Sequence, residues 1–134
     1  MTQYTLRTTV RRPYEDTVET VRGELTAAGF GILTEIDLKA TLKAKLDVDV
    51  VPQVILGACR PQLAHQALEA DPSIAALLPC NVVVRAVDDA STIVEAFDPD
   101  AMMSLAGQSD DTLRAVATDA RQRLTAVLAA LENN

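Results

Sequence analysis

The strongest constraint on the fold is a long amphipathic pattern near the C-terminal end of the chain. From about Asp110 to Leu131, apolar residues recur at steps of three and four. They are Leu113, Val116, Ala117, Ala120, Leu124, Val127, Leu128 and Leu131. This spacing places them on one face of an α-helix. A helix with one apolar face is stable when another surface covers that face, so the rest of the chain must supply it.

Shorter patterns predict that this surface is a β-sheet. Runs rich in β-branched residues predict strands over 3–10, 29–37, 54–59, 81–87 and 92–97. Helices are predicted from Pro13 to a cap at Gly29, over 38–46 and over about 61–70, with a short turn over 99–103. The order βαβαβαββα predicts one α+β domain over residues 1–134. We expect a two-layer sandwich, in which helices pack on one face of a mainly antiparallel sheet.

Composition argues against several classes of function. The net charge is −7, which disfavours binding to nucleic-acid phosphates. Only four aromatic residues are present, so few side chains could stack on bases. The chain does not start with a basic and then apolar segment, and no stretch approaches the roughly 20 apolar residues of a membrane span. Two cysteines do not suggest a disulfide framework. We therefore expect a cytoplasmic protein with reduced thiols and with neither nucleic acid nor membrane as a partner.

The two cysteines lie in the motifs Ala58-Cys59-Arg60-Pro61 and Leu77-Leu78-Pro79-Cys80-Asn81, each at a predicted strand end. If the third and fourth strands are antiparallel neighbours, Cys59 and Cys80 lie close together. Such a pair could bind a soft metal, with His65 as a third ligand, or cycle between dithiol and disulfide. The alternative is that both cysteines are small buried hydrophobic residues and that His65 is a partly exposed helix residue.

Charged residues suggest a second candidate region. Glu35 and Asp37 alternate onto one face of their strand, while Arg7, Arg85 and Glu95 point away from the apolar positions of theirs. Together these side chains could form a polar sheet face that binds a ligand. The alternative is a set of cross-strand ion pairs on a solvated or dimer-facing surface.

Two further observations limit the choice of function. All three lysines, Lys39, Lys43 and Lys45, fall within seven residues, which suggests either an anion-binding patch or a solvated helix face. The chain has no glycine-rich phosphate loop, no hydrolase nucleophile elbow and no HExxH motif. No catalytic residue is therefore assigned, and a binding role is favoured over an enzyme.

Three segments carry a family resemblance: Gly29-Phe30-Gly31-Ile32-Leu33-Thr34-Glu35-Ile36-Asp37, Ile55-Leu56-Gly57-Ala58-Cys59-Arg60-Pro61 and Leu77-Leu78-Pro79-Cys80. In this order, and with the long C-terminal helix, they resemble the motifs of the domain-of-unknown-function family 302. The resemblance covers nearly the whole chain and implies a small bacterial or archaeal α+β domain that forms a homodimer. The family usually has Asn between the first Cys and the Pro, where this chain has Arg60.

The leading functional hypothesis is a homodimeric binding protein that holds a small ligand or a soft metal near Cys59 and Cys80. Glu35, Asp37 and Arg60 are the further candidate ligand-binding residues. One alternative is a thiol-based redox protein that uses the same two cysteines. The other is an interaction module without a ligand site.

Overall fold

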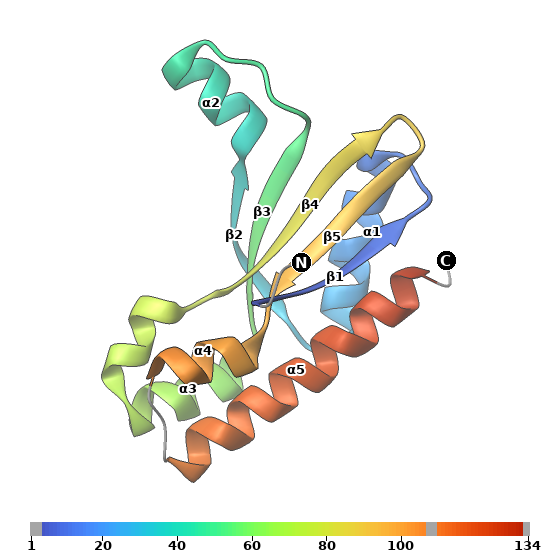
Figure 1. Ribbon diagram of the computed structural model, residues 1–134. Coiled ribbons are helices and arrows are strands. Elements are labelled where there is room, and N and C mark those ends of the chain that lie inside the picture. The colour runs from blue at the N-terminus through green and yellow to red at the C-terminus, as the bar shows by residue number, and fades with distance from the viewer. Residues whose placement is uncertain (1–3, 107–109, 133–134) are drawn as a thin grey trace.

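The computed structural model describes residues 4–106 and 110–132. Its centre is a five-stranded sheet in the order β1-β5-β4-β3-β2, in which every neighbouring pair is antiparallel (Figure 1). The strands are β1 (Thr5–Val10), β2 (Gly31–Asp37), β3 (Gln53–Cys59), β4 (Cys80–Asp88) and β5 (Ser91–Phe97).

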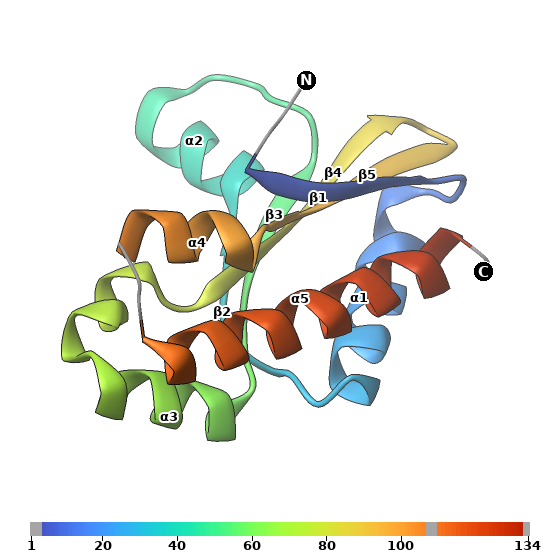
Figure 2. The same ribbon diagram turned by 60° about the horizontal axis from the view of Figure 1, so that its bottom comes forward.

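Helices cover one face and one end of this sheet. They are α1 (Tyr14–Ala27), α2 (Leu38–Leu46), α3 (Pro61–Ala70), the 3₁₀ helix η1 (Pro72–Leu77), α4 (Pro99–Ala106) and α5 (Asp111–Glu132). Figure 2 shows α1 and α5 together under the sheet, with α3 and α4 beside the first half of α5. The predicted α+β fold, with an antiparallel sheet and helices, is confirmed. Among the described residues, no helix has the length and apolar character needed to cross a bilayer.

The main core lies between the sheet and helices α1 and α5. Alternate residues of the central strands face these helices, for example Leu56 on β3, Val84 on β4 and Val94 on β5, each 0% exposed. The apolar stripe of α5 completes the core, and Leu124 in the middle of that stripe is 1% exposed. The helix therefore buries the face that its sequence pattern predicts, except at Val116, which is half-buried.

A second, smaller core lies beyond the end of the sheet, where α3, η1, α4 and the start of α5 meet. Its buried members are Ala67, Ile74, Met103, Leu113 and Ala117. This region differs from the sequence prediction, because residues 99–103 begin a helix of eight residues instead of forming a short turn. The carbonyl of Asp98 accepts hydrogen bonds from the N–H groups of Ala101 and Met102, which starts the helix.

The sheet face opposite α1 and α5, called here the open face, is not covered by any described helix (Figures 1 and 2). The strand register aligns one row of residues across it, from Arg7 through Glu95, Val83 and Ile55 to Ile36. Helix α2 projects beyond this sheet and has no buried residue. Among the described residues, the open face and α2 are thus the regular structure that the rest of the chain covers least.

Candidate functional site

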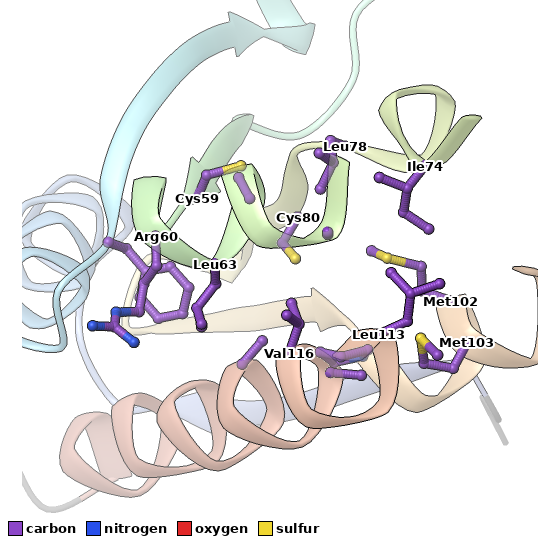
Figure 3. A pocket seen from close by; sticks show the side chains of 16 residues that line it. Cys59, Arg60, Leu63, Ile74, Leu78, Cys80, Met102, Met103, Leu113 and Val116 are labelled. Atoms are coloured by element: carbon purple, nitrogen blue, oxygen red, sulfur yellow. The ribbon is translucent and has the colours of Figure 1, made fainter. Parts of the chain in front are cut away.

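A cavity of about 50 Å³ lies where the main core meets the smaller core. The ends of β3 and β4 form one wall, and α3, η1, α4 and α5 form the others (Figure 3). Its lining is almost entirely apolar and includes Phe30, Leu63, Ile74, Leu78, Leu113 and Val116. The cavity exists because the smaller core packs against the end of the sheet and leaves a gap between the two.

Sulfur-bearing residues are concentrated around this cavity. Cys59, Cys80, Met102 and Met103 all line it, and each is 7 or 8% exposed. These four are the only cysteines and methionines of the chain apart from Met1. The buried residues of the main core, by contrast, include neither cysteine nor methionine. We call this space the sulfur-lined cavity.

The two cysteines do not form the close pair that the sequence suggested. In the β3–β4 register Ala58 lies opposite Cys80, so Cys59 is one position further along its strand. Because neighbouring side chains on a strand point to opposite faces, this offset separates the two thiols. Figure 3 shows the Cys80 sulfur directed into the cavity and the Cys59 sulfur directed away from it. Both cysteines are free and buried.

Burial also makes both thiols weak acids. It raises the pKa of Cys80 to about 11, and the neighbouring Cys59 thiol adds to this effect. Burial raises the pKa of Cys59 as well, although the backbone N–H of Cys80 partly offsets this. Both side chains are therefore neutral thiols near pH 7, whereas thiol–disulfide exchange requires a thiolate.

His65 does not join the cysteines. Its side chain is 74% exposed on α3, and its Nε2 atom lies 3.7 Å from Oε1 of Glu69, one helical turn away. Within residues 4–106 and 110–132, no three His, Cys, Asp or Glu side chains form a group that could hold a metal ion. The expected set of Cys59, Cys80 and His65 is therefore not assembled, because His65 faces solvent while the thiols are buried.

Arg60 lines the cavity with its stem, while its charged end is directed toward α5 (Figure 3). Its Nη1 lies 3.0 Å from Oδ2 of Asp119, and the same oxygen accepts a 2.9 Å hydrogen bond from Nε of Arg123. Arg123 in turn donates to the carbonyl of Ala28 over 2.8 Å. The Nε atom of Arg60 is buried and has no partner among the described residues. Arg60 therefore joins the β3–α3 junction to α5.

Glu35 and Asp37 lie away from the cavity. Glu35 forms an ion pair with Arg22 of α1, and Asp37 accepts a hydrogen bond from the N–H of Ala40 at the start of α2. Their partners across the strands are Leu56 and Val54, which face the helices. They are thus on the helix side at the edge of the sheet.

The other predicted polar residues lie on the open face, so the five do not form a common surface. There Glu95 accepts hydrogen bonds from Thr5 and Arg85, at 2.7 and 3.1 Å. Burial alone would raise the pKa of Glu95, but these bonds and the charges of Arg85 and Arg7 together lower it. This geometry is that of a cross-strand ion pair, the alternative that the sequence left open.

The lysines of α2 are exposed, and two of them have local partners. Lys43 lies 2.9 Å from Asp47 and 3.5 Å from Asp49, and Lys39 donates to the carbonyl of Val50. These contacts join the helix to the loop that follows it.

Sequence reasoning missed Met102 and Met103. Both lie in the segment interpreted as a turn, although Asp98-Pro99-Asp100 is a typical start for a helix. A helix beginning there would have placed both methionines on its second turn.

Comparisons with known proteins agree with this architecture. The family model described as "Domain of unknown function DUF302" matches residues 6–131. A crystal structure of an uncharacterized conserved DUF302 protein from Bacillus stearothermophilus superposes with a TM-score of 0.84 at 27% sequence identity. The match covers 96% of this chain and 98% of that chain. No curated protein matches the sequence. With the model spanning nearly all of its length, the chain belongs to the DUF302 family.

Proposed function

We propose that this DUF302 protein is a binding protein whose guest occupies the sulfur-lined cavity. The observation that carries the proposal is the cavity itself, a partly open apolar space beside Cys59 and Cys80. A concave apolar space with few polar groups is typical of a binding site and costs packing energy if it serves no purpose. A bound guest would supply the van der Waals contacts that the cavity walls lack.

The volume limits the size of the guest. The cavity holds about 50 Å³, whereas an engineered protein cavity that binds benzene holds about 150 Å³. Without movement of the walls, the guest is therefore an ion or a molecule of a few atoms. Two methionines among the walls permit some adjustment, because their side chains are unbranched and flexible.

The thiol-redox alternative has less support. A dithiol that cycles to a disulfide needs two sulfurs within bonding geometry and one of them as a thiolate. Here Cys59 and Cys80 are directed to opposite faces of the sheet, and burial raises the pKa of both thiols.

We also propose that the protein is a homodimer that uses the open face and α2. These parts expose aliphatic side chains, including Ile36 at 44% and Leu46 at 66%. Charged and aliphatic residues are mixed on the open face, which suits a partly polar interface. The interaction-module hypothesis would rest on the same surface.

Xenon tests the binding proposal, because it is small, apolar and known to enter protein cavities. Under xenon pressure, we expect the ¹³C-methyl NMR signals of Met102 and Met103 to shift in a saturable way. The signals of Val84 and Val94 in the main core provide the reference within the same sample. Ala64→Leu, in the cavity wall, should reduce the shift by filling the space, whereas Ala126→Leu on an exposed position of α5 should not. Methionine signals that move no more than the valine signals would contradict the proposal.

A further inference from the structure

We propose that the guest of the sulfur-lined cavity is Cu(I), bound by the sulfur atoms of Cys80, Met102 and Met103. This inference rests on the proposed function and names the chemical class of the ligand. It assigns a role to two methionines that the sequence did not single out, and it leaves Cys59 outside the site.

The first argument is the placement of the sulfurs. Figure 3 shows the Cys80 sulfur directed into the cavity, with the side chains of Met102 and Met103 entering from α4. All three residues are more than nine-tenths buried. Within the described residues, the Cys80 thiol has no hydrogen-bond partner and belongs to no disulfide. A buried, unpartnered sulfur that lines the same cavity as two thioethers is an available donor.

The second argument is the softness of the donors. Thiolate and thioether sulfur select Cu(I) over harder divalent ions, which prefer oxygen or imidazole. No Asp, Glu or His lines the cavity. The one charged lining residue is Arg60, and its Nη1 is paired with Asp119. The lining therefore offers soft sulfur ligands, and it lacks both the carboxylates that Mg²⁺ and Ca²⁺ require and the four Cys or His ligands of a structural Zn²⁺ site.

The third argument is charge. When Cu(I) displaces the proton of the Cys80 thiol, one proton leaves to solvent and one Cu–S bond forms, with no change of oxidation state. The resulting pair of Cu⁺ and thiolate is neutral, and the two thioethers add no charge. A divalent ion with the same ligands would leave one uncompensated positive charge in an apolar space, which is costly. A monovalent soft cation is thus the metal whose charge fits this cavity.

The distribution of sulfur distinguishes this proposal from ordinary packing. Methionine and free cysteine are common core residues, and as mere fillers they would occur in both cores. Instead, all four lie around one cavity, and the larger main core contains none of them.

The test is anaerobic titration of the whole protein with Cu(I), kept reduced by ascorbate, in competition with a chromophoric Cu(I) chelator. We expect one Cu(I) per chain. Cys80→Ala should weaken binding by roughly 100-fold or more, exceeding the loss expected for an outer-shell partner. Met102→Leu and Met103→Leu, which keep the apolar volume, should each weaken it by roughly 10-fold. Cys59→Ala compares the neighbouring thiol, whose sulfur is directed away from the cavity, and should weaken binding far less than Cys80→Ala does.

X-ray absorption of the loaded protein supplies an independent readout. Sulfur alone in the first shell supports the assignment, whereas nitrogen or oxygen donors would overturn it. Equal losses in Cys59→Ala and Cys80→Ala, or parental affinity in Cys80→Ala, would overturn it as well. If Cu(I) is not retained but xenon still shifts the Met102 and Met103 signals, the copper assignment fails and the binding proposal stands. If neither probe binds, both fail.

Discussion

At the residue scale, Glu95 shows how a sheet can hold a charge on its uncovered side. Its side chain is only 13% exposed, yet it remains ionised because Thr5 and Arg85 donate to it and two arginines lie nearby. A buried carboxylate with these partners is stable, while the same carboxylate without them would not be.

The lowered pKa of Glu95 predicts a dependence of stability on pH. Because the pKa is lower in the folded than in the unfolded protein, the ionised group stabilises the fold above the unfolded value of about 4.3. This contribution is lost as the pH falls through the folded pKa. Glu95→Gln should therefore cost about 1–2 kcal/mol in urea unfolding at pH 7 and progressively less toward pH 3. The exposed Glu69→Gln is the control, and an unchanged cost at both pH values would contradict the interpretation.

The two cysteines show why residue roles were harder to predict than elements. Their motifs were correctly placed at the ends of β3 and β4, and these strands are neighbours. Whether the two thiols face each other depends on a register difference of one residue, because side chains alternate along a strand. Hydrophobic periodicity locates a strand within a few residues and does not fix pairing to that accuracy.

At the scale of elements, α5 has the largest influence on the fold, and its stripe was predictable because a 3.6-residue period over 22 residues has few alternatives. Helix α3 was also predictable, since Pro61 marks its first position.

The polar residues of β2 were assigned to the wrong surface. Ile36 lies on the open face, and Glu35 and Asp37 lie on the other side, where α1 supplies Arg22 as a partner.

The packing of α5 can be tested at one position. Leu124 is 1% exposed in the main core, so Leu124→Ala should lower the free energy of unfolding by about 2–5 kcal/mol. The adjacent Thr125→Ala, on the exposed face, should change it by less than about 0.5 kcal/mol. Chemical denaturation of both variants measures the difference. A similar small change in both would mean that the stripe does not face the sheet.

At the scale of the whole molecule, the cavity results from the meeting of two cores. The sheet with α1 and α5 forms one, and the layer of α3, η1 and α4 forms the other. Neither core alone encloses the space, which explains why no single segment of the sequence indicated it. The mixture of sulfur and aliphatic side chains appears only when Cys80 from the sheet and the two methionines of α4 are brought together.

The open face leads to a prediction about assembly. An uncovered sheet with exposed aliphatic side chains is a typical interaction surface, and a projecting helix without buried residues extends it. We expect light scattering at micromolar concentration to give about twice the 14.3 kDa mass of one chain. Ile36→Glu places a charge in the middle of this surface and should shift the mass toward one chain. Ala126→Glu is the matched control, because Ala126 is exposed on α5, which packs on the opposite face of the sheet. A parent protein with the mass of one chain would refute the dimer, and an equal effect of both substitutions would move the interface away from the open face.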